Sequence, residues 1–234
     1  MLRHLLRYLP GERFLYYGDS ANAPYGRRTT AQVQELTLAA AERMMKYGLK
    51  ALVVACNTAT AAAIQALRQT YGNLIVIGIE PALKPAVDQF PGGRIGVMAT
   101  QVTLREEKFA AQMDRFPGMH ISTIPVPTLV ELVEQGHLND RAVEDLLRPA
   151  LAPYAGKLDA VVLGCTHYPF AAKTIGKLLG ENTAVLDGGE GTARETKRRL
   201  EEAGLLFQGA GELVLENSTH DPRLLRLSME LLES

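Results

Sequence analysis

The chain has 234 residues, of which 47% are hydrophobic, and its formal net charge is −1. This length suits one large domain or two compact lobes. The balanced charge gives no electrostatic reason to expect nucleic acid or an anionic membrane as a partner, and no apolar run approaches the ~20 residues of a membrane span. The first residues predict an amphipathic helix over Leu2–Tyr8 and lack the features of a signal peptide, so we expect a cytoplasmic protein.

Apolar, strand-like runs alternate with longer helical patterns along the whole chain, which is typical of parallel α/β units. The strands expected, in chain order, are Arg13–Tyr17, Ala51–Ala55, Leu74–Ile77, Arg94–Met98, His120–Ile124, Ala160–Leu163, Ala184–Leu186 and Glu212–Leu215. The helices expected after the first are Thr30–Tyr47, Ala61–Gln69, Thr103–Arg115, Asp140–Tyr154, Ala171–Leu179, Gly191–Glu202 and Pro222–Glu233. The pattern predicts an α/β fold with mostly parallel sheets flanked by helices.

The two cysteines stand in matching surroundings, one in each half of the chain. Ala51–Thr58 reads ALVVACNT and Ala160–His167 reads AVVLGCTH, so each apolar run ends in a small residue, a cysteine and hydrogen-bonding side chains. Repetition at about half the chain length indicates duplicated lobes. We expect two pseudo-symmetric lobes, 1–80 plus 190–234 and 81–189, with the active site in the cleft between them.

Alignment of the two halves leaves one strand without a counterpart. The second half opens with the strand Arg94–Met98 and its following loop, whereas the first half opens with the helix Leu2–Tyr8. If the duplication is real, the first lobe should begin with one more strand and one more loop. The comparison therefore predicts an N-terminally incomplete first lobe with reduced activity.

A cysteine after a buried strand is, taken alone, more often a small hydrophobic residue than a catalytic group. Two thiols with matched polar neighbours reverse that preference. Open α/β sheets place their sites just past the strand ends, so Cys56 and Cys165 could serve as facing acid and base groups. We expect reduced thiols rather than a disulfide.

Three ordered motifs together resemble glutamate racemase of the aspartate/glutamate racemase family. They are Tyr17–Gly26 (YGDSANAPYG), Val54–Ala59 (VACNTA) and Leu163–Pro169 (LGCTHYP). The resemblance covers essentially the whole chain in the right order. One departure is that the family opens with a strand and an Asp-Ser-Gly loop that nothing here matches. Asp19 and Ser20 belong to a different motif and do not take over the role of that loop.

The resemblance implies a set of site residues as well as the reaction. The implied catalytic residues are Cys56, Cys165, His167 and Glu134. The implied substrate-binding residues are Pro24, Tyr25, Gly26, Asn57, Thr58 and Thr166, to which the lobe symmetry adds Thr100 and Thr103. Read without the family, most of these are helix caps, a turn, a hydrogen-bonding histidine and a surface glutamate on an amphipathic helix.

By family implication, the activity is interconversion of L- and D-glutamate by two thiols, supplying D-glutamate for peptidoglycan. No P-loop, dinucleotide fingerprint or metal-ligand spacing is present in the sequence, and two thiols need no cofactor. We expect glutamate as the small-molecule partner and a homodimer as the assembly. Two alternatives stay open: a racemase for aspartate or hydantoins, and a catalytically impaired fragment that acts only as a binding module.

Overall fold

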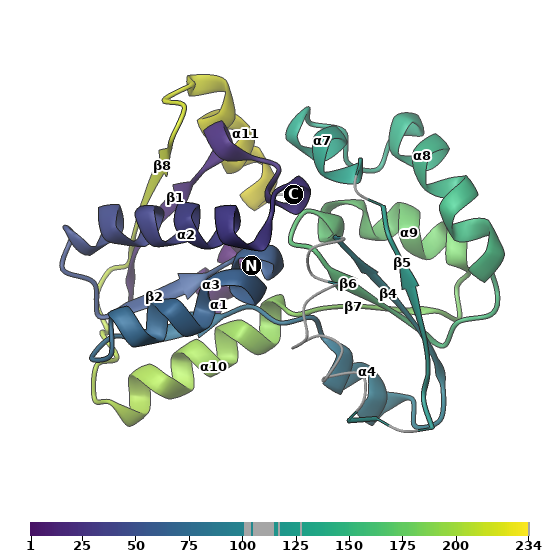
Figure 1. The fold of residues 1–234 in the computed structure, drawn as a ribbon, viewed down its shortest axis with the longest axis horizontal. Coiled ribbons are helices and arrows are strands. Elements are labelled where there is room, and N and C mark those ends of the chain that lie inside the picture. Colours follow the sequence, from purple (N-terminus) through teal and green to yellow (C-terminus); the bar gives the residue numbers. More distant parts are fainter. Residues whose placement is uncertain (101–103, 105–114, 117, 127, 234) are drawn as a thin grey trace. The chain divides into compact units, whose positions relative to one another are not determined.

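The computed structural model describes residues 1–100, 104, 115–116, 118–126 and 128–233. These residues form two compact units. Unit 1 comprises Met1–Ile79 and Gly189–Ser234, and unit 2 comprises Glu80–Gly188. The helix expected over Thr103–Arg115 lies largely outside the described residues. Figure 1 shows both units as α/β structures, which confirms the predicted fold class.

Unit 2 is built on one sheet of four parallel strands in the order β5-β4-β6-β7. The strands are β4 (Arg94–Ala99), β5 (His120–Ile124), β6 (Ala160–Gly164) and β7 (Ala184–Asp187). Its α-helices are α4 (Leu83–Gln89), α7 (Leu129–Glu134), α8 (Arg141–Leu151) and α9 (Ala172–Leu179). Short 3-10 turns, η3 (Ala152–Tyr154) and η4 (Tyr168–Ala171), follow α8 and precede α9.

Both faces of the sheet in unit 2 are covered, which explains its continuous apolar strands. On one face, side chains of α7, α8 and α9 pack with Met98, Val161 and Leu163 in a cluster that also holds Cys165. On the other face, α4 packs against Ile95 and Val97. Figure 1 shows α8 and α9 on one side of the strands and α4 on the other. The loop that carries Cys165 therefore starts at the end of a central strand that is packed on both faces.

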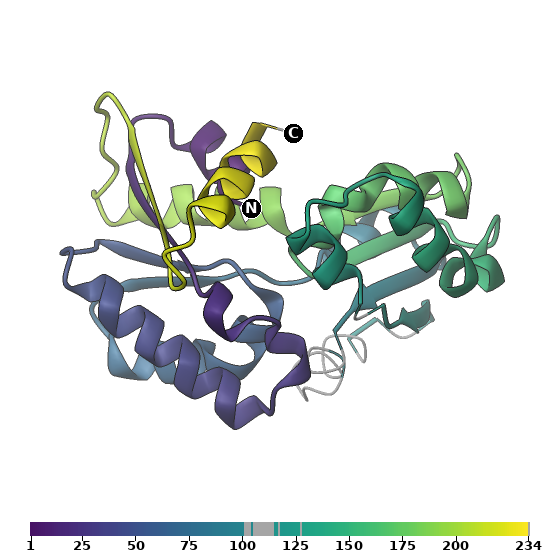
Figure 2. The ribbon, with the colours of Figure 1, turned by 90° about the horizontal axis from the view of Figure 1, so that it is seen from above.

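Unit 1 contains two separate pairs of parallel strands, β1 with β8 and β2 with β3. Its strands are β1 (Arg13–Gly18), β2 (Ala51–Val54), β3 (Ile75–Gly78) and β8 (Glu212–Asn217). Its helices are α1 (Leu2–Tyr8), η1 (Ser20–Asn22), η2 (Tyr25–Arg27), α2 (Thr30–Met45), α3 (Asn57–Thr70), α10 (Gly189–Glu202) and α11 (Pro222–Glu233). In Figure 2, α2 and α3 lie on one side of β2 and β3, and α10 lies on the other.

The boundaries of α2 follow directly from the sequence. Thr29 and Gln32 exchange hydrogen bonds in a capping box at its start, and Gly48 follows its end with a φ of +67°. In contrast, α3 begins at Asn57 and not at the predicted Ala61. The prediction missed this first turn because its threonines have low helix propensity, whereas Thr60 N donates to Cys56 O and closes the turn.

Among the described residues, no helix combines the length and the apolar character that a bilayer crossing would need.

Candidate functional site

Cys56 lies at the junction of a strand and a long helix in unit 1. Strand β2 ends at Val54, and Cys56 is the N-cap residue of the 14-residue helix α3, with extended backbone angles. The helix is held close to β3, because a Cβ atom at Gly78 would lie 2.4 Å from Thr60 Cγ2. A helix N-terminus favours negative charge. The fold therefore places this thiol where a thiolate is stabilised.

The two residues after Cys56 are polar and almost fully buried. Asn57 is 4% exposed and Thr58 is 3% exposed. The side-chain oxygen of Asn57 is buried, and no hydrogen-bond donor of the described chain reaches it. Burying an unsatisfied carbonyl costs roughly 1–3 kcal/mol. A buried acceptor beside a thiol is suited to an N–H donor of a bound ligand, such as an ammonium group.

The Pro24–Gly26 segment lies beside the same thiol. Pro24, Tyr25 and Gly26 are half-buried, and Tyr25 and Cys56 pack against the same cluster of α2, α3 and β2 side chains. The Tyr25 hydroxyl donates to Asp19 Oδ2 at 2.7 Å. Burial, this hydrogen bond and the negative charge of Asp19 all raise the pKa of Tyr25, so it stays a neutral donor. Asp19 thus fixes the side chain of Tyr25 next to Cys56.

Sequence reasoning left Asp19 without a role, and the structure supplies one. Its two carboxylate oxygens accept from Asn22 Nδ2, each at 3.0 Å, as well as from Tyr25. The carboxylate therefore organises the whole turn between β1 and α2. An aspartate six residues before a tyrosine, with a proline in between, was the only sequence signal for this contact.

We expect Tyr25→Phe to lower the free energy of unfolding by about 1 kcal/mol, because it removes one hydrogen bond to a partly buried carboxylate. Tyr47→Phe is the matched control. Tyr47 donates to Glu216 at 2.6 Å but is 56% exposed, so its loss should cost less than about 0.5 kcal/mol. Urea unfolding of both variants measures the difference, and equal losses would show that Asp19 does not anchor Tyr25.

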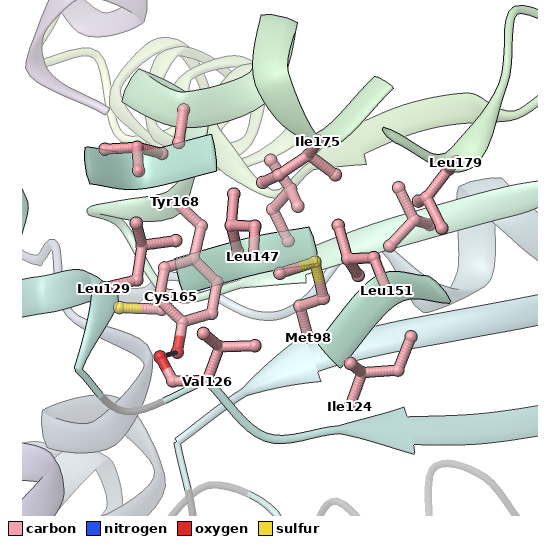
Figure 3. Close-up of a cluster of buried hydrophobic side chains, with 14 of the residues drawn as sticks. Met98, Ile124, Val126, Leu129, Leu147, Leu151, Cys165, Tyr168, Ile175 and Leu179 are labelled. Atoms are coloured by element: carbon pink, nitrogen blue, oxygen red, sulfur yellow. Dashed lines mark hydrogen bonds between the residues drawn. The ribbon is translucent and has the colours of Figure 1, made fainter. Parts of the chain in front are cut away.

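Cys165 lies in a different environment in unit 2. It is 8% exposed and follows β6 directly, next to Tyr168 and Leu129 in the cluster drawn in Figure 3. The Tyr168 hydroxyl donates to Val126 O at 2.8 Å, which ties the loop to the segment after β5. The 3-10 turn η4 follows this cysteine and leads into α9, whereas the longer helix α3 begins directly after Cys56.

A histidine and a glutamate form a chain of polar contacts that ends at Cys165. His167 Nδ1 lies 3.8 Å from Cys165 Sγ, and His167 Nε2 lies 2.7 Å from Glu134 Oε1. Burial lowers the pKa of His167, but its hydrogen bonds to Cys165 and Glu134 outweigh this effect and raise the pKa to about 10. The hydrogen bond from His167 holds the pKa of Glu134 below its usual value, against the effect of burial. At neutral pH the pair is therefore an imidazolium and a carboxylate beside Cys165.

We expect Glu134→Gln to lower the pKa of His167, because it removes the negative charge that stabilises the imidazolium. A titration of the His167 ring protons by NMR measures the change. His137 is the internal control, since it pairs with Asp140 at 2.6 Å and not with Glu134. An unchanged titration of His167 in the variant would show that Glu134 does not influence it.

The same pair fixes the pH range of its stabilising effect. The contribution of His167 to the free energy of unfolding is complete below its ordinary pKa of 6.5 and is lost as the pH rises toward about 10. The contribution of Glu134 to the free energy of unfolding is complete above its ordinary pKa of 4.5 and is lost on acidification. The free energy of unfolding of the wild type should therefore exceed that of Glu134→Gln most between pH 4.5 and 6.5.

The remaining predicted residues all fall within the stretch of the chain that forms unit 2. Thr166 is half-buried between Cys165 and His167, and Thr100 is 5% exposed directly after β4, where its carbonyl accepts from Leu104 N. Thr103 lies outside the described residues. Within the part of the chain that the structure describes, no group of three or more His, Cys, Asp or Glu side chains could hold a metal ion.

Comparison with known proteins identifies the family of the chain. The model of the Asp/Glu/Hydantoin racemase family matches residues 2–196. The chain belongs to this family. A glutamate racemase from Clostridium perfringens is 45% identical to this racemase-family chain over 238 residues, covering 100% of the chain and 91% of the relative.

Two solved structures of the family are also similar. Glutamate racemase from Escherichia coli, in complex with L-glutamate and the activator UDP-MurNAc-ala, matches with a TM-score of 0.87 and 28% identity. The match covers 99% of this chain and 89% of that structure. Glutamate racemase from Francisella tularensis in complex with D-glutamate matches with a TM-score of 0.86 and 25% identity, covering 100% and 88%. These matches confirm the family resemblance and the two-lobe racemase fold.

Proposed function

We propose that this protein is a glutamate racemase, which interconverts L- and D-glutamate and supplies the D-enantiomer for peptidoglycan. The observation that carries the proposal is the pair of thiols, Cys56 and Cys165, each just past the end of a parallel strand and each with its own polar surroundings. The 45% identity to a glutamate racemase supports the choice of substrate. The solved relatives hold both enantiomers of glutamate, which also supports it.

The proposed reaction moves one proton off the α-carbon and another onto it. A thiolate on one face removes the Cα proton and leaves the electron pair on Cα, as a carbanion stabilised by the carboxyl group. The thiol on the opposite face then delivers its own proton, and this inverts the configuration. The reverse reaction exchanges the roles of Cys56 and Cys165. The mechanism requires one thiol on each face of Cα, and it needs no cofactor.

The surroundings of the two thiols fit them to this exchange by different means. The N-terminus of α3 stabilises a thiolate at Cys56. At Cys165, the His167 imidazolium supplies the positive charge, and Glu134 keeps that imidazolium protonated and in place. Asn57 offers its buried carbonyl oxygen to the substrate ammonium, and backbone N–H groups at the start of α3 suit a carboxylate. Tyr25, Gly26, Thr58, Thr100 and Thr166 are proposed as further substrate contacts.

The test is a racemisation assay followed by chiral chromatography, with L-glutamate, D-glutamate, both aspartates and a hydantoin as separate substrates. We expect both glutamate enantiomers to converge on an equal mixture, whereas the other compounds stay largely unchanged. Preference for aspartate or a hydantoin would replace the proposed substrate with that of another branch of the family. Binding of glutamate without racemisation would support the binding-module alternative.

A further inference from the structure

Thr60 is a buried polar residue of unit 1 that the proposed reaction does not use. It lies in the first turn of α3, four residues after Cys56, and is 3% exposed. Its backbone N–H donates to Cys56 O at 2.8 Å, and its hydroxyl donates to Val54 O at 3.2 Å. One residue thus bonds both to the last residue of β2 and to the residue that carries the thiol.

The side chain of Thr60 is also enclosed by the neighbouring strand. A Cβ atom at Gly78, the last residue of β3, would lie 2.4 Å from the Thr60 methyl carbon and 3.0 Å from its hydroxyl oxygen. Val54 O accepts from Ile79 N at 3.1 Å as well as from Thr60. The hydroxyl therefore completes a junction in which the ends of β2 and β3 and the start of α3 share one acceptor.

The corresponding position in the second half of the chain has different chemistry. The two cysteine motifs align Cys56 with Cys165 and Thr60 with Pro169. Proline has neither an N–H nor a hydroxyl to donate. Cys165 O accepts instead from Tyr168 N, at 3.1 Å, at the start of η4. The contacts of Thr60 thus belong to the thiol whose neighbour is a long helix and not to the thiol whose neighbour is a histidine.

We propose that Thr60 is a positioning residue for Cys56, and that its hydroxyl fixes the start of α3 relative to the thiol. The stabilisation that a helix N-terminus gives to a negative charge falls off within the first turn. A first turn without this tether would shift relative to Cys56 and would stabilise its thiolate less. The catalytic meaning of this role rests on the proposed racemase function, whereas the effect on the thiol does not.

The experiment measures how the rate of Cys56 alkylation by iodoacetamide depends on pH, in the whole chain without substrate, by mass spectrometry. Thr60→Val keeps the shape of the side chain and removes the hydroxyl, and Val54 O retains its bond from Ile79 N. The pH midpoint of alkylation should rise by about 0.5 in this variant. Thr60→Ser is the matched control, because it keeps the hydroxyl and should keep the wild-type midpoint.

Gly78→Ala tests the same junction from β3. Its new Cβ atom would displace the Thr60 side chain, so the midpoint of Cys56 should rise although the hydroxyl is still present. Tyr25 faces Cys56 from the turn after β1, and its hydrogen bond to Asp19 should persist in all three variants. A rise in Gly78→Ala would therefore come from the altered contact of α3 with the strands.

Two results would overturn the proposal. One is a midpoint of Cys56 in Thr60→Val that equals that of the wild type or of Thr60→Ser. The other is an equal shift at Cys165, because this would indicate a general loosening of the protein.

A racemisation assay separates this inference from the proposed function. Thr60→Val should lower kcat about threefold at a pH below the midpoint, with little change in KM, since a smaller fraction of Cys56 is ionised. A raised midpoint in Thr60→Val, combined with a wild-type protein that does not racemise glutamate, would support the positioning role and contradict the proposed function.

Discussion

Cys56→Ser and Cys165→Ser should each reduce glutamate racemisation by roughly 10²–10⁴-fold, because each face of Cα needs its own proton carrier. A serine hydroxyl has nearly the shape of the thiol but neither ionises nor donates as readily. The rates of both directions should fall together, since the equilibrium constant of a racemisation is one. Steady-state kinetics with each enantiomer measure the loss.

A control and an isotope experiment make this prediction sharper. Thr174→Ser removes a methyl group from a side chain that is 5% exposed in α9, and it should leave turnover unchanged. In D₂O, wild-type enzyme should place deuterium first in the product enantiomer, while the remaining substrate stays protiated. A single acid/base group would instead return solvent deuterium to both enantiomers at equal early rates, and this would exclude the two-thiol mechanism.

His167→Ala should have the second-largest effect, a loss of roughly 10²-fold in kcat, because it removes the charge that supports the Cys165 thiolate. His137→Ala is a matched control. His137 also pairs with a carboxylate at 2.6 Å, and its side chain is 41% exposed, but its partner is Asp140, the N-cap residue of α8. Its loss should leave kcat within about twofold.

The pH profile separates a direct role of His167 from a structural one. If His167 acts on the ionisation of Cys165, the variant should require a higher pH for half-maximal kcat than the wild type does. A merely structural role would lower kcat equally at every pH. Equal activity of His167→Ala and wild type would show that the contact to Cys165 Sγ at 3.8 Å has no catalytic consequence.

Local patterns in the sequence were sufficient for much of the fold. Alternation of apolar runs and helical periods predicted the parallel α/β class, and helix α2 begins at the expected Thr30 but ends at Met45, two residues before its expected end. The helix α4 was not among those expected, because Pro81 and Pro85 make the segment a poor helix candidate. In the structure, Pro85 lies in the first turn of α4, where its missing N–H has no cost.

The candidate site was less accessible to sequence reasoning, because its contacts join distant segments. Glu134 read as a surface glutamate, yet it lies 2.7 Å from His167 Nε2, in a contact between the end of α7 and the loop after β6. The helix α7 itself was not among those expected. The family resemblance named both residues, but only the fold shows how one affects the other. The duplicated cysteine motif likewise did not reveal that Cys56 lies at the start of a long helix, whereas Cys165 contacts a histidine.

The order of the segments along the chain has a consequence for how the protein is made. Unit 2 is one uninterrupted stretch, Glu80–Gly188, whereas unit 1 needs both ends of the chain. Arg13 of β1 pairs with Glu212 of β8, so this ladder cannot form until nearly the whole chain has been synthesised. Pairing between such distant segments is slow, while contiguous units fold early. During synthesis the middle of this protein should therefore resist proteolysis before its beginning does.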